Sequence, residues 1–353
     1  MTSRYDVDRD ALTELLAEWG EPRYRGDQIW DALYKSSAPL ENATALPRAL
    51  RDRLGAALPL ALAPVVDATS ADGLTTKWLW AAGGDRAQVE TVLMRSARRA
   101  TVCVSSQAGC AMACSFCATG QAGFERHLTA GEIIEQIVRA AQASPQRVSN
   151  VVYMGMGEPL ANYDPVWTSV ERLHRDLGIS ARRITISTVG VVPAMRRLAT
   201  ARLPVTLAVS LHAADDELRN ELVPLNHRYP IAEVLDAAAE VAGTRGRRVT
   251  FEYACIAGVN DSPRQIEALG RLLGRWPGVG GAHVNLIPLN ATAGYGGRAP
   301  ARLKLRGLAE RLGAHGVEAT VRRPRGVDID AACGQLRARM MPGAPAPSTT
   351  MGP

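Results

Sequence analysis

The sequence is poor in cysteine and in aromatic residues, with six cysteines and 5% Phe, Trp and Tyr among 353 residues. It contains no apolar run of the ~18–20 residues that a membrane-spanning helix needs, and its first ten residues lack the basic and apolar regions of a signal peptide. Six cysteines in a chain of this length do not form a disulfide framework. We therefore expect a cytoplasmic protein without a membrane segment, in a reducing compartment.

Positive charge is present in excess and is unevenly distributed. The net charge is +6 and the sequence pI is about 9.2. Residues 1–60 carry eight Arg and Lys against ten Asp and Glu, whereas residues 301–340 carry nine against four. The arginines could belong to ordinary solvated helix faces. Clusters such as the RRPR run at 322–325 are equally candidates for contacts with nucleic-acid phosphates.

The chain divides by pattern into five segments. Residues 1–62 predict a small helical domain, because apolar residues recur there at helical spacing. Residues 63–99 predict a linker and a β-extension. Residues 100–323 alternate strand-like and helix-like runs with unusual regularity. Residues 324–340 form a C-terminal segment that contains a cysteine, and the small, Pro-rich residues 341–353 predict a disordered tail.

The alternation predicts an α/β fold, a partial (βα)6 barrel with parallel strands and right-handed crossovers. Six units are too few for a complete eight-stranded barrel, so we expect one side to stay open. In βα barrels the working residues lie on loops at the C-terminal ends of the strands, and the unusual polar and glycine-rich motifs of this sequence follow strand-like runs. The strand-like runs are 100–105, 148–154, 183–187, 204–211, 248–255 and 281–287, and the helix-like runs are about 129–143, 163–177, 190–201, 230–243, 262–274 and 300–314.

The clearest chemical motif is the C-x₃-C-x₂-C run formed by Cys110, Cys114 and Cys117. Its spacing places three thiolates on one short loop, close enough to converge on one metal centre. Iron–sulfur clusters are held by cysteine thiolates, and a cubane cluster held by only three of them keeps one iron open for a further ligand. The alternative is a structural zinc site, which usually has four closed ligands in paired motifs.

Taken singly, the other motifs have ordinary explanations. A Gly-x-Gly turn after a strand can simply need a positive φ, Ser187 can cap the following helix, and His212 can be a satisfied core histidine. Cys333 lies in an Ala-Ala-Cys-Gly loop and not on a hydrophobic face. Cys255, in the strand-like FEYAC run, is by contrast expected to be a buried and inert thiol.

In combination the motifs are much more specific. They are QVETVLM (88–94), CVSSQAGC (103–110), CATG (117–120), GF-x-R-x-LT-x-GEI (123–133), MGMGEPLANY (154–163), ISTVG (186–190), VSLHA (209–213), LIPLN (286–290) and RGVDIDAACGQL (325–336). In this order they closely resemble the RlmN/Cfr family of radical S-adenosylmethionine RNA adenine methyltransferases, over about residues 12–340. The segment SSAPLENATALPRAL departs from the family's usual wording. The resemblance implies that the partial barrel is of the radical S-adenosylmethionine type.

The resemblance also implies the cofactors and the roles of the site residues. One 4Fe-4S cluster would be held by the three motif cysteines, and two molecules of S-adenosylmethionine would serve each turnover, as methyl donor and as radical source. Cys333 would carry the methyl group as S-methylcysteine, while Cys103 and Glu90 would help to resolve the crosslink between protein and RNA. A disulfide bond is implied as well. The residues matched to S-adenosylmethionine contacts are Gly157, Glu158, Ser187, Ser210, Leu211, His212 and Asn290.

The substrate implied by the resemblance is C2 of adenosine 2503 in 23S rRNA, with adenosine 37 of some tRNAs as a second target. This carbon is not nucleophilic, so ordinary polar methyl transfer fails there. The nearest alternative is the Cfr-type enzyme, which methylates C8 of adenine with the same cysteines. A radical activase of another protein and a zinc-stabilised RNA-binding protein are further alternatives. We also expect a flavodoxin-like external electron donor and a monomeric chain.

Overall fold

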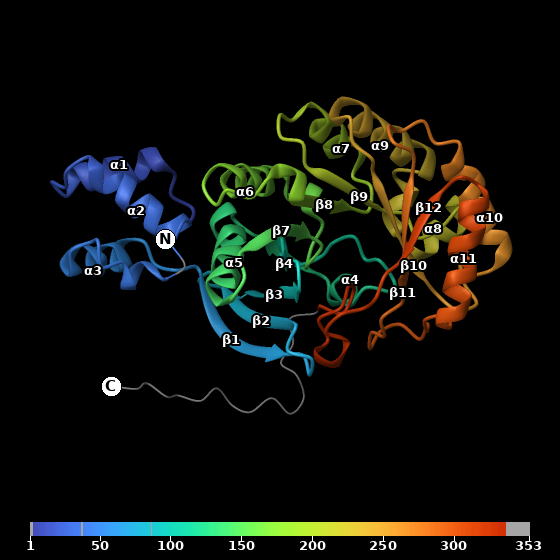
Figure 1. Ribbon diagram of the computed structural model, residues 1–353, viewed down its shortest axis with the longest axis horizontal. Helices are drawn as coiled ribbons and strands as arrows, with labels where there is room; N and C mark the ends of the chain where they lie inside the picture. Colours follow the sequence, from blue (N-terminus) through green and yellow to red (C-terminus); the bar gives the residue numbers. More distant parts are fainter. Residues whose placement is uncertain (1–2, 37, 86, 337–353) are drawn as a thin grey trace.

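The N-terminal part of the computed structural model is a small helical layer with a core of its own. The structure describes residues 3–36, 38–85 and 87–336. Asp8 caps the first helix by accepting a hydrogen bond from the N–H of Ala11. The core of the layer also includes Ile134 and Val138, so the layer packs against the main body (Figure 1). Its helices are α1 (Arg9–Glu18), α2 (Tyr24–Tyr34) and α3 (Arg48–Ala57), with the short turn η1 (Leu40–Asn42).

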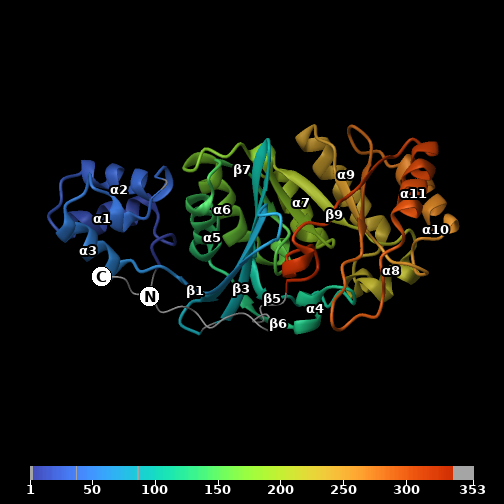
Figure 2. The same ribbon diagram turned by 60° about the horizontal axis from the view of Figure 1, so that its bottom comes forward.

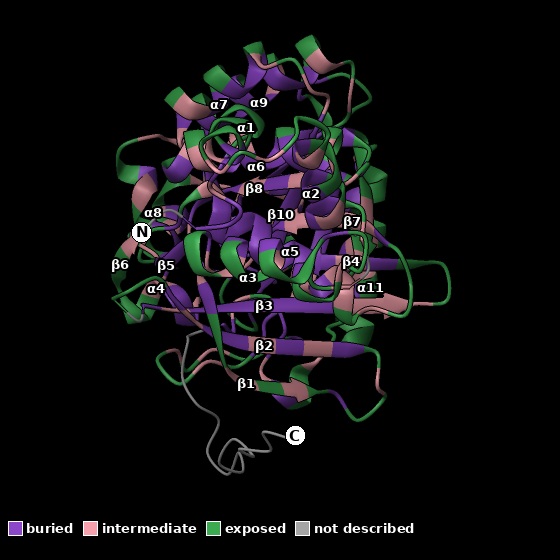
Figure 3. Cartoon of the chain, turned by 90° about the vertical axis from the view of Figure 1, so that its left-hand side faces the viewer, coloured by how far each residue is buried: buried purple, intermediate pink, exposed green. Residues whose placement is uncertain are grey.

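An antiparallel extension connects this layer to the main sheet. Its strands are β1 (Leu62–Thr69), β2 (Thr75–Ala82) and β3 (Ala87–Ser96), and β3 pairs antiparallel with β4 (Arg99–Cys103). Figure 3 shows β2 and β3 largely buried, whereas the edge strand β1 is more exposed. Strands β2 and β3 lie in the stretch for which we expected a β-extension, whereas β1 occupies part of the stretch that we expected to be a linker.

From β4 onward the sheet is parallel and contains seven strands, β4 included. The complete sheet has ten strands in the order β1-β2-β3-β4-β7-β8-β9-β10-β11-β12, and it does not close into a barrel. All six predicted strands are present, and the prediction missed a seventh strand, β12, at the open edge. The strands after β4 are β7 (Val148–Tyr153), β8 (Ile184–Thr188), β9 (Thr206–Ser210), β10 (Thr250–Cys255), β11 (His283–Pro288) and β12 (Glu318–Val321).

Helices cover the outer face of the curved sheet, and the large hydrophobic core lies between them and the strands (Figure 2). All six predicted helices form, and Thr129 and Glu132 make a capping box at the first of them. They are α5 (Ala130–Ala143), α6 (Tyr163–Arg175), α7 (Val192–Thr200), α9 (Ile231–Arg245), α10 (Pro263–Gly274) and α11 (Arg302–Ala314). The prediction missed the short helices α4 (Ala118–Ala122) and α8 (Asp216–Leu222), which lie on loops around the inner face.

The inner face of the sheet is covered by loops and by the C-terminal segment. A separate two-stranded sheet flanks the cysteine motif. Strand β5 (Gln107–Gly109) precedes the motif and β6 (Phe124–His127) follows it. After β12 the chain crosses back over the inner face through the turn η5 (Val327–Ile329) (Figure 2). The predicted tail at 341–353, and residues 337–340 of the predicted C-terminal segment, lie outside the described residues. No helix in the described part is long and apolar enough to cross a membrane.

Candidate active site

The three motif cysteines lie on a loop between β5 and α4 whose path depends on glycine. Gly109 has a φ of +72°, and a Cβ there would lie 2.1 Å from the carbonyl oxygen of Gly123. The N–H of Cys110 donates to that same carbonyl at 2.7 Å, and the N–H of Cys117 donates to the carbonyl of Cys114 at 3.1 Å. The glycines therefore allow the loop to turn tightly and to present its cysteines together.

The thiols of this cysteine loop influence one another. Burial raises the pKa of Cys110 to about 12 and that of Cys114 well above its usual range, and the neighbouring charge of Cys117 raises both further. Within the described residues, no three His, Cys, Asp or Glu side chains form a group that could hold a single metal ion.

Arg219 is a buried cation near the cysteine loop. Its guanidinium donates to the carbonyls of Leu211 at 3.0 Å, Ser210 at 3.1 Å and Val189 at 2.6 Å, which fixes the ends of β8 and β9. Burial lowers its pKa to about 10, and its charge lowers the pKa of Cys114. A buried cation close to a motif thiol, with apolar residues packed around Cys114, fits an iron–sulfur cluster held by thiolates.

His212 follows β9 and is held as a neutral ring. Its φ is +63°, and its Nδ1 accepts a hydrogen bond from the N–H of Ala254 at 3.0 Å. Burial and the charge of Arg219 lower its pKa to about 3. The ring packs edge-on against Phe116 of the cysteine loop, with 4.8 Å between ring centroids. The described geometry therefore gives His212 a structural role beside the cluster loop, in addition to the cofactor contact that we predict.

The predicted cofactor residues on β7, β8 and β9 converge at the C-terminal edge of the sheet. The hydroxyl groups of Ser187 and Ser210 lie 3.5 Å apart on neighbouring strands. Gly157 has a φ of +97°, and a Cβ there would lie 2.5 Å from the Cβ of Gln107. Glu158 is buried, and its carboxylate accepts hydrogen bonds from the N–H groups of Leu160 and Val189.

Burial raises the pKa of Glu158 to about 7 despite these two donors. Leu211 has its side chain in the hydrophobic core, so only its main chain can face a ligand. Asn290 donates from Nδ2 to the carbonyl of Cys333 at 2.9 Å, a contact that the sequence did not indicate. These cofactor assignments stay predictions, and the structure adds a second role for Asn290 as a clamp on the cysteine-bearing loop.

Hydrogen bonds with residues that are distant in the sequence hold the segment 324–336, which carries Cys333, against the β-extension and the cysteine loop. Two of them reach the β-extension: the N–H of Ala71 donates to Asp328 at 2.8 Å, and the guanidinium of Arg325 donates to the carbonyl of Arg95 at 2.8 Å. The third, from the N–H of Ala118 to the carbonyl of Gly334 at 2.8 Å, reaches the end of the cysteine loop. The segment therefore spans the inner face between these two parts.

Cys333 and Cys103 lie close enough for their charges to interact. Burial raises the pKa of Cys103, and the charge of Cys333 raises it further. The side chain of Cys333 keeps solvent-accessible surface, and its pKa is raised by desolvation and by the charge of Glu252. Both are free thiols, as are the other four cysteines, so the implied disulfide is absent from this state. Cys255 is fully buried, as predicted.

Glu90 has a partner that the sequence did not identify. Its carboxylate forms an ion pair with Lys77 of β2, with 3.0 Å between Nζ and Oε1, and both side chains are almost completely buried. Lys77 also donates to the carbonyl of Asp330 at 3.1 Å, three residues before Cys333. A lysine at an inward position of the apolar TTKWLW strand was the available signal. Lys77 thus connects the predicted catalytic carboxylate to the catalytic loop.

A further polar group on the inner face was also missed. Glu252 of β10 is buried and accepts a hydrogen bond from Asn285 of β11 at 2.8 Å. Burial raises the pKa of Glu252, and the charge of Arg322 opposes that change. The same two charges act on Cys333, whose pKa Glu252 raises and Arg322 lowers. Arg322, directly after the unpredicted strand β12, is therefore near enough for its charge to act on both groups.

Comparison with known proteins supports this assembly of residues. Residues 104–269 match the family described as "Radical SAM superfamily". The chain is 51% identical over 355 residues to "Probable dual-specificity RNA methyltransferase RlmN" of Parafrankia sp. (strain EAN1pec), covering 94% of this chain and 91% of the relative. It is 50% identical over 348 residues to the protein of the same name in Thermobifida fusca (strain YX), covering 94% of each.

A solved structure agrees in fold as well. The crystal structure of a radical SAM methyltransferase from Sphaerobacter thermophilus matches with a TM-score of 0.91 and 47% sequence identity, covering 96% of this chain and 100% of that chain. The similarity therefore extends over nearly the whole length and is not confined to the cysteine loop.

Proposed function

Because the chain belongs to the RlmN family of RNA methyltransferases within the radical SAM superfamily, we propose that it methylates C2 of adenosine 2503 in 23S rRNA and of adenosine 37 in some tRNAs. It is an S-adenosylmethionine-dependent methyltransferase, and its family implies a 4Fe-4S cluster. The cluster would be held by Cys110, Cys114 and Cys117. Gly157, Ser187 and Ser210 are among the residues that would bind S-adenosylmethionine.

The proximity of Cys333 to both Cys103 and the cysteine loop is the observation that carries this proposal. The two cysteines are 230 positions apart in the sequence, yet Cys103 packs in one apolar cluster with Ile329, Ala331 and Leu336 of the segment that carries Cys333. Gly334 is also hydrogen-bonded to Ala118 beside the cysteine loop. A radical enzyme that only activates another protein has no use for a second pair of thiols at the cluster. A zinc-stabilised binding module has no use for it either.

When bound, the cluster and two molecules of S-adenosylmethionine supply the methyl group and the 5′-deoxyadenosyl radical that removes a hydrogen atom from it. Cys333 carries the methyl group as S-methylcysteine and delivers its carbon to C2 of the adenine. Glu90 would accept the proton that C2 loses, and the adduct would give up its unpaired electron to the oxidised cluster. The thiolate of Cys103 would then attack the sulfur of Cys333 and form a disulfide, while the carbon would leave with the bonding electron pair and take a proton back from Glu90 to become the methyl group of the base. An external thiol reductant would restore both cysteines.

The arrangement of Glu90 supports its role in moving a proton. Lys77 holds the carboxylate by a buried ion pair and is itself hydrogen-bonded to Asp330 of the catalytic loop. A proton acceptor fixed relative to the loop that presents the methylene group can act at the neighbouring carbon.

Removal of the target adenosine from its stack costs a few kcal/mol, which contacts to the surrounding RNA must offset.

The deciding experiment is nucleoside mass spectrometry on a 23S rRNA hairpin from the peptidyl-transferase centre. The hairpin is incubated without oxygen with reconstituted protein, S-adenosylmethionine and a flavodoxin-like one-electron donor. Formation of 2-methyladenosine by the wild type and the Cys255→Ala control, but not by Cys333→Ala, would support the proposal. Formation of 8-methyladenosine would assign the chain to the Cfr-type reaction. Absence of any methylated adenosine, with an intact cluster that cleaves S-adenosylmethionine, would refute the substrate.

Two expectations about the working state accompany the proposal. We propose that the enzyme is a cytoplasmic monomer, because its RNA substrates are cytoplasmic and no feature of the described residues requires a second chain to complete the site. Size-exclusion chromatography with light scattering checks the monomer directly. A stable dimer at micromolar concentration would contradict it without affecting the assignment of the reaction.

A further inference from the structure

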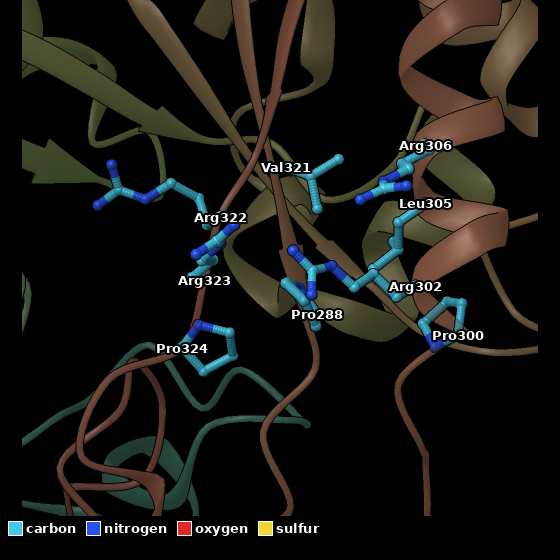
Figure 4. A pocket seen from close by; sticks show the side chains of 9 residues that line it. All are labelled: Pro288, Pro300, Arg302, Leu305, Arg306, Val321, Arg322, Arg323 and Pro324. Atoms are coloured by element: carbon cyan, nitrogen blue, oxygen red, sulfur yellow. The ribbon is translucent and has the colours of Figure 1, made fainter. Parts of the chain in front are cut away.

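A basic groove lies beside the end of β12. It has a volume of about 400 Å³ and lies between the first turns of α11 and the residues that follow β11 and β12. Figure 4 shows Arg302 and Arg306 extending from α11 towards the strands, with Arg323 opposite them. The lining residues are Pro288, Pro300, Arg302, Leu305, Arg306, Val321, Arg322, Arg323 and Pro324.

The arginines that face this groove differ from other basic residues of the same helix. On α11, Lys304 is paired with Asp261, and Arg311 is paired with Glu267 at 3.1 Å. Arg302, Arg306 and Arg323 are exposed, and none of them forms an ion pair or a hydrogen bond with a described residue. Three guanidinium groups around one groove, without carboxylate partners there, leave a concentrated positive charge for an anion from outside.

The N-terminus of α11 adds to this positive potential. The helix is 13 residues long, its N-cap residue Ala301 makes no side-chain cap, and its first turn contains no acidic residue. The unsatisfied N–H groups of a helix N-terminus favour negative charge, and phosphate groups bind there in many proteins. Pro300 and Arg302 place this first turn in the wall of the groove.

The groove is connected to the reaction site through one short strand. Arg322 and Arg323 are consecutive, and Figure 4 shows their side chains directed to different sides of the chain. Both arginines line the groove, and the charge of Arg322 also acts on Glu252 and Cys333. Arg323 lies ten residues before Cys333 in the sequence. An RNA strand whose adenosine reaches Cys333 would therefore pass close to the groove.

We propose that this groove binds phosphodiester groups of the RNA backbone next to the target adenosine, through Arg302, Arg306 and Arg323. The inference rests on the proposed RNA substrate and specifies which surface holds it. Arginine is the residue best suited to bidentate phosphate contacts, and the proline and leucine side chains of the wall offer apolar surface to ribose and base. Arg325 is excluded from the set because it is already bonded to the carbonyl of Arg95.

The test is the salt dependence of RNA affinity for a triple variant, Arg302→Gln, Arg306→Gln and Arg323→Gln. Fluorescence anisotropy with the peptidyl-transferase hairpin gives the dissociation constant between 50 and 200 mM salt. Loss of three phosphate contacts should reduce the slope of log affinity against log salt by about 2. The ratio of wild-type to variant RNA affinity should then fall by about 16-fold between 50 and 200 mM salt.

A matched control removes the same amount of charge elsewhere. Arg196, Arg248 and Arg311 form surface ion pairs with Glu240, Glu318 and Glu267. Their triple replacement by Gln should leave the salt slope within about 0.5 of the wild-type value, because paired surface arginines are not expected to touch RNA. If the groove variant loses its thermal unfolding transition, Arg306→Gln alone, at an exposed position, should still lower the slope by about 0.7.

The outcomes separate this inference from the proposed function. Failure of the wild type to bind or methylate the hairpin would refute the proposed substrate. Wild-type binding with equal slopes for the groove variant and the wild type would refute the groove alone. Equal slopes combined with slower reduction by the flavodoxin-like donor would also overturn the inference, because they would assign the groove to an acidic protein. A slope reduced only in the groove variant supports it.

Discussion

Two segments bring cysteines to the active site, and they are held there in different ways. The cysteine loop, residues 110–117, owes its shape to contacts within and just beneath it, such as the close approach of Gly109 to Gly123. The C-terminal segment at 324–336 also makes local turns, such as the hydrogen bond from the N–H of Ala331 to the carbonyl of Gly326. In addition, Lys77, Ala71 and Asn290, which are distant in sequence, hold it against the rest of the protein.

This difference matches the role of each segment in the proposed reaction. A cluster needs fixed ligands, and a loop whose backbone is hydrogen-bonded at Cys110, Ser115 and Cys117 supplies them. Cys333 must exchange partners during the proposed reaction, with the methyl donor, with the RNA and with Cys103. A segment held by several separate side-chain hydrogen bonds can shift without unfolding the sheet behind it. The contrast leads to predictions that test each half.

The largest effect should separate the two segments completely. Cys114→Ala removes a cluster ligand, so iron bound per chain after anaerobic reconstitution should fall to background. Substitution of residues that only hydrogen-bond to metal ligands already lowers the affinity for the metal by about 10–100-fold. Cys333→Ala should retain full iron and still cleave S-adenosylmethionine, yet form no methyladenosine. Iron analysis and chromatography of 5′-deoxyadenosine check both. A Cys333→Ala protein without iron would show that the C-terminal segment helps to hold the cluster.

The second effect concerns the anchor of the C-terminal segment in the β-extension. Lys77→Met removes the cation from a buried ion pair with Glu90, which should lower the free energy of unfolding by about 3–5 kcal/mol. The double variant with Glu90→Gln should recover most of that loss. Urea unfolding measures both, with Lys35→Met, from a surface pair with Asp31, as a control that changes little. A loss below about 1 kcal/mol for Lys77→Met would show that other groups stabilise the carboxylate.

The same contrast explains how much could be predicted from the sequence. The cysteine loop was predictable because its signal is local: the spacing of Cys110, Cys114 and Cys117 and the flanking glycines are all visible in a few residues. The six main strands and helices were predictable from the periodicity of apolar residues. Strand β12, with only four residues and a single neighbour, β11, lacks such a period and was missed.

The rest could not be predicted because it depends on which distant residues meet. Lys77 is unremarkable in a β-strand until the structure places it against Glu90 and Asp330. Asn290 was predicted only as a cofactor contact, since nothing in its neighbourhood shows that the carbonyl of Cys333 lies within hydrogen-bond distance. The RRPR run at 322–325 was considered as one basic cluster, yet Arg322 and Arg323 line the groove whereas Arg325 is bonded to the β-extension.

The third effect tests the support of the cysteine loop through pH. His212 has a pKa of about 3 in the folded protein, against about 6.5 when unfolded, so only the unfolded chain gains a proton between these values. Stability should therefore fall as the pH drops below 6.5, by about 1.4 kcal/mol at pH 5.5 from this residue. His212→Asn, which tolerates a positive φ, should remove that part of the pH dependence in urea unfolding.

The comparison must be between variant and wild type, because Glu158 acts in the opposite direction. Its pKa of about 7 lies above the unfolded value of 4.5, so its contribution is lost as the pH rises through that range. The difference in unfolding free energy between His212→Asn and wild type cancels this background. A difference that is the same at pH 7.5 and pH 5.5 would mean that the folded protein accommodates a charged ring at this position.

The smallest effect should distinguish the two roles of Asn290. Asn290→Ala removes one hydrogen bond to the carbonyl of Cys333, worth about 1 kcal/mol. Local opening of residues 330–336 should then become about fivefold more frequent, which hydrogen exchange measured by mass spectrometry detects. Gln335→Ala, which removes a similar bond from the same segment to the carbonyl of Ala291, should have a comparable effect. Faster exchange in both variants would identify Asn290 as part of the clamp. Unchanged exchange, combined with weaker binding of S-adenosylmethionine in Asn290→Ala alone, would instead mean that its amide acts on the cofactor and that the Cys333 loop is held without it.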